Sequence, residues 1–225
     1  WLYLPLDYSE SDGPWPLILY LHGSGWIGHD LEDLKTYPES IPAIMDDPAN
    51  AEMLPQLFRS VVVSPLCTAA RTVQGTPYWN TDTLRDFLEE LLLTYPIDPD
   101  RVYLTGTSMG GCACWEFASK FPERVAAMIP ISGYAPPLTV LDNLGRTPAW
   151  AFHGDADSVV PVREAINTVG QARGFGGDVT FTVYPGEGHG VWVKQRVYLN
   201  PDIYEWLLGH KELTVESEVP FWELY

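Results

Sequence analysis

The stretch from Arg101 to Phe121 constrains the fold of this chain more than any other. An apolar, β-branched run opens it and an apolar stripe at helical spacing closes it, so the stretch predicts a strand, a sharp turn and a helix. The turn reads GTSMG, a G-x-S-x-G pattern centred on Ser108. Small residues around a serine let the chain bend tightly and project the hydroxyl above the sheet. Unpaired N–H groups at the start of the helix favour the negative charge that forms when serine attacks a carbonyl, so we predict that Ser108 is a nucleophile.

Length and charge limit what surrounds this turn. The chain has 225 residues, of which 46% are hydrophobic, and we expect one domain over residues 1–225 with residues 211–225 as a C-terminal extension. The formal charge is −17 with only 13 Lys and Arg, which argues against nucleic acid or an anionic membrane as a partner. No apolar run is long enough to span a bilayer. We therefore interpret the acidic composition as a source of solubility.

The start of the chain and its cysteines carry little information on the compartment. The chain opens at Trp1 in the strand-like WLYLPL, so we expect a leader or a first strand to lie outside it, and both a cytoplasmic and a secreted location stay open. Cys67, Cys112 and Cys114 do not make a disulfide framework and are expected as buried thiols. Their spacing with the five histidines does not resemble a zinc site, so we expect no metal and no cofactor.

Strand and helix patterns alternate along the chain without internal repeats. This alternation predicts an α/β fold with a mostly parallel central sheet and helices on both faces. The connector at residues 133–147 is too short for a helical cap, so no large cap domain is expected. The expected strands lie at residues 1–6, 16–21, 59–65, 102–105, 124–132, 148–153 and 178–184, and the expected helices at residues 81–95, 109–121, 162–173 and 201–210.

The loop after the second expected strand has two interpretations. The run HGSGWIG from His22 to Gly28 matches G-x-G-x-x-G, the dinucleotide-binding pattern. That pattern needs a helix at its last glycine, whereas the following segment is interrupted by Pro38 and Pro42 and has poor periodicity. We therefore favour an oxyanion loop, in which an N–H group after the His-Gly pair and the N–H of Met109 hold a developing negative charge.

Partners for a serine nucleophile follow two later strands. HGDADSVVP contains Asp155 and Asp157 after the strand at residues 148–153, where an α/β sheet places its ligands. YPGEGHG contains His189 after the last strand, in a loop whose glycines let the ring fold back toward Ser108. We predict that His189 is the general base and that one of the two aspartates orients it. The order serine, aspartate, histidine is that of the α/β-hydrolase fold.

Four separated motifs, LHGSG, LTGTSMGG, HGDADSVVP and YPGEGHG, resemble the compact, capless esterase branch of the α/β hydrolases. This branch includes phospholipase/carboxylesterase-like, dienelactone-hydrolase-like and "predicted peptidase" proteins, and the resemblance covers residues 2–210. It implies that the acid of the triad is Asp157 and that the oxyanion position after His-Gly is Ser24. Trp26 and Ile27 depart from a loop that often carries polar residues.

Other conspicuous residues have less specific interpretations. His22 and His153 are expected to hold loops by hydrogen bonds rather than to bind metal. Trp26, Trp79 and Trp192 lie beside the oxyanion loop, before a helix cap and after His189, and are tentative substrate contacts. The terminal residues 211–225 are expected to pack either against the body or against another subunit, as in a homo-oligomer.

The combined pattern predicts a serine carboxylic-ester hydrolase that works through an acyl-enzyme on small, soluble esters. His189 would take the proton of Ser108, Asp157 would hold the imidazole tautomer, and the amides of Ser24 and Met109 would stabilise the oxyanion. The alternatives are a peptidase, thioesterase or lysophospholipase with the same triad, and a non-catalytic hydrolase-like binding module.

Overall fold

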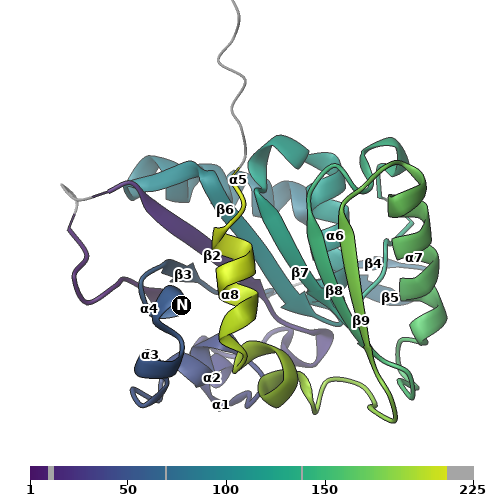
Figure 1. The fold of residues 1–225 in the computed structure, drawn as a ribbon, viewed down its shortest axis with the longest axis horizontal. Helices are drawn as coiled ribbons and strands as arrows, with labels where there is room; N and C mark the ends of the chain where they lie inside the picture. The colour runs from purple at the N-terminus through teal and green to yellow at the C-terminus, as the bar shows by residue number, and fades with distance from the viewer. Residues whose placement is uncertain (10–12, 69, 138, 212–225) are drawn as a thin grey trace, which may run out of the picture.

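The computed structural model describes residues 1–9, 13–68, 70–137 and 139–211. The expected C-terminal extension therefore lies outside the described residues, except for Lys211. The centre of the molecule is a seven-stranded sheet in which every neighbouring pair is parallel apart from β1 and β3 (Figure 1). All seven expected strands belong to it. In order across the sheet they are β1 (Leu2–Tyr3), β3 (Val61–Val63), β2 (Trp15–Leu21), β6 (Ile97–Thr107), β7 (Ala127–Ile131), β8 (Ala149–Gly154) and β9 (Val179–Tyr184).

The two faces of the sheet pack into two separate cores. In β2, Leu17, Leu19 and Leu21 belong to one core, whereas Ile18 and Tyr20 belong to the other. Successive side chains of a strand point to opposite faces, so a continuously apolar strand needs cover on both sides. Helices α5 (Thr81–Thr94), α6 (Met109–Lys120) and α7 (Val162–Gly174) contribute to the first core, and α2 (Ile41–Met45), α4 (Pro55–Phe58) and α8 (Pro201–Leu208) contribute to the second.

The segment between β2 and β3 is more helical than its prolines suggest. Besides α2 and α4 it contains α1 (Asp33–Thr36) and α3 (Asn50–Met53). Pro42 lies in the first turn of α2, where its missing N–H has no intrahelical acceptor to lose. The Ser40 side chain caps this helix by accepting the N–H of Ala43 at 3.0 Å. The proline thus starts a short helix, which the interrupted periodicity concealed.

A two-stranded hairpin outside the main sheet was not expected. It consists of β4 (Arg71–Val73) and β5 (Thr76–Tyr78), which pair antiparallel. Gln74 and Gly75 form the turn with φ angles of 51° and 83°, the left-handed conformation that two-residue hairpins favour. The remaining short elements are a π-helical turn, η4 (Lys194–Tyr198), and the 3-10 turns η1 (Ser24–Trp26), η2 (Pro122–Arg124) and η3 (Leu141–Asn143).

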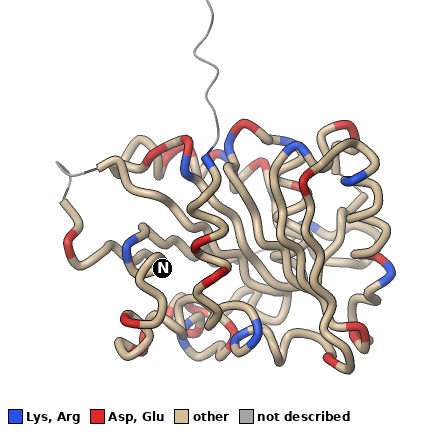
Figure 2. Tube along the Cα trace, in the orientation of Figure 1, with Lys and Arg blue, Asp and Glu red and all other residues tan. Residues whose placement is uncertain are grey.

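The described part of the connector that follows β7 does not cover the sheet with a helical cap. Within its described residues, the connector at 133–147 contains only the turn η3, so a helical cap does not form there, as expected. Charged residues lie along the loops and outer helices, and the central strands carry few of them (Figure 2). None of the described helices combines the length and the apolar character needed to cross a membrane.

Candidate active site

Ser108 lies in a strained turn between the end of β6 and the start of α6. Its φ is 60° and its ψ is −117°, a conformation that costs energy in a residue with a side chain and needs support from the surrounding packing. A Cβ on Gly106 would lie 2.6 Å from the carbonyl oxygen of Leu21, and one on Gly110 would overlap the same oxygen. The two glycines therefore let the turn pack closely against the end of β2.

A chain of two short hydrogen bonds connects Ser108 to a carboxylate. The Ser108 Oγ lies 2.9 Å from Nε2 of His189, and Nδ1 of the same ring lies 2.6 Å from Oδ2 of Asp157. An ionised carboxylate can only accept, so Nδ1 carries the proton and Nε2 is left as the acceptor for the serine hydroxyl. The structure thus brings together the three residues that the sequence singled out, in a geometry in which Ser108 can lose its proton to His189.

Asp157 is held on its second oxygen by the backbone. Its Oδ1 accepts the N–H groups of Val159 and Val160 at 2.9 and 2.8 Å, and the residue is 6% exposed. The buried ring of His153 lies beside it, with Nε2 3.4 Å from Oδ2 of Asp157 and 2.9 Å from the carbonyl oxygen of Val160. Burial lowers the pKa of His153, so this ring is neutral at neutral pH and donates from Nε2. His153 therefore supports the loop, as expected.

Asp155 has a different task in the same loop. Its Oδ1 accepts the N–H of Gly186 at 2.6 Å, and the N–H of Ala156 donates to the carbonyl oxygen of Glu187 at 3.0 Å. Both bonds join the aspartate loop to the loop that carries His189. Asp155 thus sets the distance between the two loops, whereas Asp157 faces the imidazole.

Two backbone amides adjoin Ser108 at the places expected for an oxyanion hole. Ser24 is the first residue of η1 and Met109 is the first residue of α6, so neither N–H has an acceptor within its own helical turn. Both residues line the same cavity as Ser108. The start of α6 also places the positive end of its dipole at the nucleophile.

The loop that carries Ser24 is anchored through His22. The N–H of Cys67 donates to Nε2 of His22 at 2.9 Å, so the ring proton must reside on Nδ1, which lies 2.8 Å from the carbonyl oxygen of Gly23. The indole Nε1 of Trp79 donates to the backbone carbonyl of His22 at 3.1 Å. Burial lowers the pKa of His22, which keeps this ring neutral. His22 therefore fixes the backbone immediately before Ser24.

The cavity at Ser108 has a volume of about 340 Å³, which suits a small ligand. The hairpin β4–β5 supplies one wall, the segment after Asp157 supplies another, and α6 supplies the floor. Its lining residues are Ser24, Thr76, Pro77, Tyr78, Ser108, Met109, Cys112, Tyr134, Val159, Val160, Pro161 and Glu164.

A pair of phenols is the main polar feature of this cavity. The hydroxyls of Tyr78 and Tyr134 lie 2.7 Å apart. Burial, the hydrogen bond to Tyr78 and nearby Glu164 raise the pKa of Tyr134, so its hydroxyl stays neutral. Glu164 is the charged residue among the lining residues. The cavity therefore offers aromatic surface, neutral hydroxyls and negative charge.

Trp26, Trp79 and Trp192, the three tryptophans singled out in the sequence, are not among the described lining residues of this cavity, and their contact with substrate stays a prediction. Trp79 is 6% exposed and packs edge-on against His22, and Trp192 is 4% exposed and donates to the carbonyl oxygen of Gly188 at 2.7 Å. The Trp26 ring packs against Tyr37 with a centroid distance of 4.8 Å. Trp79 and Trp192 are thus buried, and their indole N–H groups bond the backbone of the loops that carry Ser24 and His189.

Sequence reasoning missed several residues that surround the site. Tyr78, Tyr134 and Glu164 come from three separate segments and carry no motif; only the Gln74–Gly75 pair between short β-forming runs signals the hairpin. Glu39 was also missed. A Cβ on Gly190 would lie 3.8 Å from Glu39 Oε2, so this carboxylate adjoins the His189 loop. Burial raises the pKa of Glu39, against the lowering effects of the Tyr37 hydroxyl and of His189.

The cysteines and the remaining ligand-type side chains do not assemble into another centre. All three cysteines lie in the described part of the chain, are buried and form no disulfide, and burial raises the pKa of Cys112 to about 12. Within the described residues, no group of three or more His, Cys, Asp or Glu side chains is placed to hold a metal ion. The G-x-G-x-x-G run itself contains the 3-10 turn η1, and the next helix is the four-residue α1, instead of the long helix that a dinucleotide site needs at the last glycine.

Comparison with known families supports the esterase resemblance. The model of the Phospholipase/Carboxylesterase family matches residues 49–205. The chain is 28% identical to acyl-protein thioesterase 1 of Gibberella zeae over 41% of this chain and 43% of that protein. It is 33% identical to the bifunctional acetylxylan esterase/xylanase XynS20E of Neocallimastix patriciarum over 71% of this chain and 21% of that protein. The chain spans less than half of the length of these curated relatives.

Solved structures agree with this result. A thermostable esterase superposes with a TM-score of 0.76 at 28% identity, over 93% of this chain and 58% of that one. Esterase PE8 superposes with a TM-score of 0.61 at 22% identity, over 92% of this chain and 95% of that one. The α/β-hydrolase fold expected from the sequence is confirmed.

Proposed function

The chain belongs to the Phospholipase/Carboxylesterase family, and we propose that it is a serine esterase whose catalytic triad is Ser108, His189 and Asp157. The observation that carries the proposal is the pair of hydrogen bonds, 2.9 and 2.6 Å long, that joins the three side chains. These distances lie within the reach that proton transfer requires. The strained backbone of Ser108 supports the same assignment, because such strain is concentrated at functional sites.

In the proposed reaction, Ser108 Oγ attacks the ester carbonyl while His189 Nε2 takes its proton. The resulting imidazolium is stabilised by Asp157, whose other oxygen is fixed by two amides. His189 then protonates the leaving alcohol, and an acyl group remains on the serine. Water attacks this acyl-enzyme by the same steps, which releases the acid and restores the serine.

The N–H groups of Ser24 and Met109 are the proposed donors to the oxyanion. A preorganised donor of this kind lowers the barrier by roughly 3–4 kcal/mol, because it meets the charge only as the charge develops. The bonds from Cys67 and Trp79 to His22 support this role, since they hold the loop that carries Ser24.

We further propose that the substrates are small, uncharged esters with short acyl or aryl groups. The cavity at Ser108 holds about 340 Å³, and no cationic side chain occurs among its lining residues. Glu164 within it and the formal charge of −17 both disfavour anionic substrates. Tyr78 and Tyr134, which line the cavity, support an aryl group in the substrate because they offer aromatic surface. The similarity to a thioesterase makes a short acyl thioester the second candidate substrate.

A fluorophosphonate probe tests the mechanism. We expect one covalent adduct on Ser108, and we expect Ser108→Ala and His189→Ala each to lower kcat by roughly 10⁴-fold or more with an unchanged melting temperature. If the folded protein is not labelled, it is a non-catalytic binding module. If either variant retains near-native turnover, the triad assignment is wrong.

An acyl-length series tests the substrate class. With p-nitrophenyl esters we expect kcat/KM to be highest from acetate to butyrate and to fall steeply toward long chains, with no increase at micelle formation. The kcat/KM values of thioesters with the same acyl groups, measured in parallel, show whether the enzyme prefers an alcohol or a thiol leaving group. A maximum at long chains would contradict the proposed class.

A further inference from the structure

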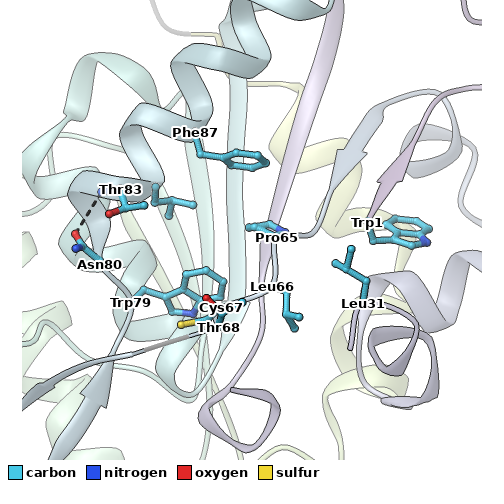
Figure 3. A pocket seen from close by; sticks show the side chains of 11 residues that line it. Trp1, Leu31, Pro65, Leu66, Cys67, Thr68, Trp79, Asn80, Thr83 and Phe87 are labelled. Atoms are coloured by element: carbon cyan, nitrogen blue, oxygen red, sulfur yellow. Dashed lines mark hydrogen bonds between the residues drawn. The ribbon is translucent and has the colours of Figure 1, made fainter. Parts of the chain in front are cut away.

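A second cavity lies beside Cys67 and Trp79, the two residues that hydrogen-bond to His22. Its volume is about 520 Å³, and it lies between α5 and the segment that follows β3 (Figure 3). Phe87 and Thr83 reach it from α5, Leu66 and Cys67 from the segment after β3, and Trp79 from the end of the hairpin. Among their described lining residues the two cavities have none in common.

The lining of this second cavity selects for an uncharged, apolar ligand. No Asp, Glu, Lys, Arg or His occurs among its described lining residues, and the aromatic rings of Trp79 and Phe87 supply much of its surface. A charged ligand would lose its hydration there without gaining a charged side chain as a partner. An apolar molecule that displaces water from a cavity of this size gains free energy by burying its own apolar surface, as in ligand cavities of comparable volume.

The floor of this cavity is built from the residues that hold the oxyanion loop. Trp79 and Cys67 line it, and both hydrogen-bond to His22, which directly precedes the Gly23–Ser24 amides. The ring of Trp79 also packs against the imidazole of His22, with centroids 4.9 Å apart. A ligand that contacts Trp79 and Cys67 therefore touches the support of the loop without entering the cavity at Ser108.

We propose that this cavity is a second binding site, which takes one uncharged apolar molecule with a ring or a short alkyl chain, and that its occupancy alters turnover at Ser108 through His22. The proposed binding of a ligand depends only on the properties of the second cavity. The effect on turnover rests on the esterase function proposed above.

Binding is measured with N-phenyl-1-naphthylamine, an uncharged fluorescent probe, and with its sulfonated relative 8-anilinonaphthalene-1-sulfonate. We expect one saturable site for the uncharged probe and at least about tenfold weaker binding of the sulfonate. Phosphonylation of Ser108 should leave one saturable site for the uncharged probe, with its affinity changed by less than about tenfold. Equal binding of both probes would overturn the proposal, and so would loss of binding after phosphonylation, which would place the probe beside Ser108.

A variant that fills the cavity locates the site. Thr83 is exposed on α5 at the cavity, so Thr83→Trp should be tolerated and should weaken probe binding by about tenfold or more. Leu93→Trp is the matched control, because Leu93 is 89% exposed on the same helix and does not line the cavity. Unchanged probe affinity in a folded Thr83→Trp protein would overturn the site.

Steady-state kinetics test the coupling. Saturating probe should change kcat for p-nitrophenyl acetate by about twofold or more and leave KM unchanged, and Thr83→Trp should abolish this response. Competition that raises KM alone would contradict a separate site. Unchanged kinetics with bound probe would overturn the coupling, and because binding is read by fluorescence, that result is distinct from a failure of the esterase assignment.

Discussion

Replacement of Glu116 should destabilise the protein and loosen one wall of the cavity at Ser108. Glu116 lies on α6 with its side chain 1% exposed, and its carboxylate has three partners. Its Oε2 lies 2.8 Å from Arg71 on β4, and its Oε1 lies 2.9 Å from Lys120 and accepts the Thr81 hydroxyl at 2.8 Å. The carboxylate thus joins the hairpin, the start of α5 and the helix that follows Ser108.

The expected magnitude follows from these contacts. Loss of one partner from a buried ion pair costs about 3–5 kcal/mol, because the remaining charge is left without compensation. Arg71 and Lys120 are 24% and 18% exposed and keep part of their hydration, and glutamine retains one acceptor oxygen. We therefore expect Glu116→Gln to lower the free energy of unfolding by about 2–3 kcal/mol. For a chain of this length, that corresponds to a melting temperature roughly 5–10 °C lower.

Differential scanning calorimetry measures the loss, with Glu32→Gln as the control. Glu32 forms a surface pair with Lys35, and the Glu32 side chain is 80% exposed. The melting temperature of the Glu32→Gln variant should therefore differ from that of the wild type by less than about 1 °C. The loss in Glu116→Gln should persist at high salt, because buried pairs are screened weakly. Since Tyr78 on the same hairpin lines the cavity, KM should rise more than kcat falls. A Glu116→Gln protein that melts within about 1 °C of wild type would refute the reasoning.

The remaining predictions concern the catalytic loops. Asp157→Asn should lower kcat by about 10⁴-fold, far more than Asp155→Asn, because only Asp157 faces the imidazole; the reverse order at equal thermal stability would contradict the assignment. Trp79→Phe should lower kcat by about tenfold with little change in KM, because the carbonyl of His22 loses its donor; equal losses in both constants would indicate a different role.

The three residues of the proposed triad could be predicted because each depends on its own short segment. The G-x-S-x-G turn needs glycines where β2 passes close to it, a steric requirement that is visible in the sequence around Ser108. Asp157 and His189 follow strands β8 and β9, and parallel strands deliver their ends to one edge of the sheet. Alternation of strands and helices therefore sufficed to bring these side chains together.

The walls of the site could not be predicted, because they depend on contacts between distant segments. Tyr78 meets Tyr134 only because the hairpin folds over the start of α6, and the carboxylate that holds the hairpin there, Glu116, looks like an ordinary helical residue in the sequence. The sequence also left open which way the tryptophan rings face. Their positions beside motifs were evident, but whether a ring faces a cavity or the core is decided by packing.

The residues of the proposed triad and the walls of the cavity are held by different parts of the fold, which affects how the substrate preference could change. The residues of the proposed triad and the Met109 amide are positioned by the sheet and α6, whereas Tyr78 lies on a hairpin that is held by the buried Glu116 carboxylate and by the Tyr134 hydroxyl. Substitutions in the hairpin can therefore reshape the cavity at Ser108 while the hydrogen bonds of the triad stay intact. The Ser24 amide depends on both the sheet and the hairpin. Its loop follows β2 and is held by Trp79, the residue that directly follows the hairpin. We accordingly expect changes in β4 and β5 to act first on KM, and changes at Trp79 to act first on kcat.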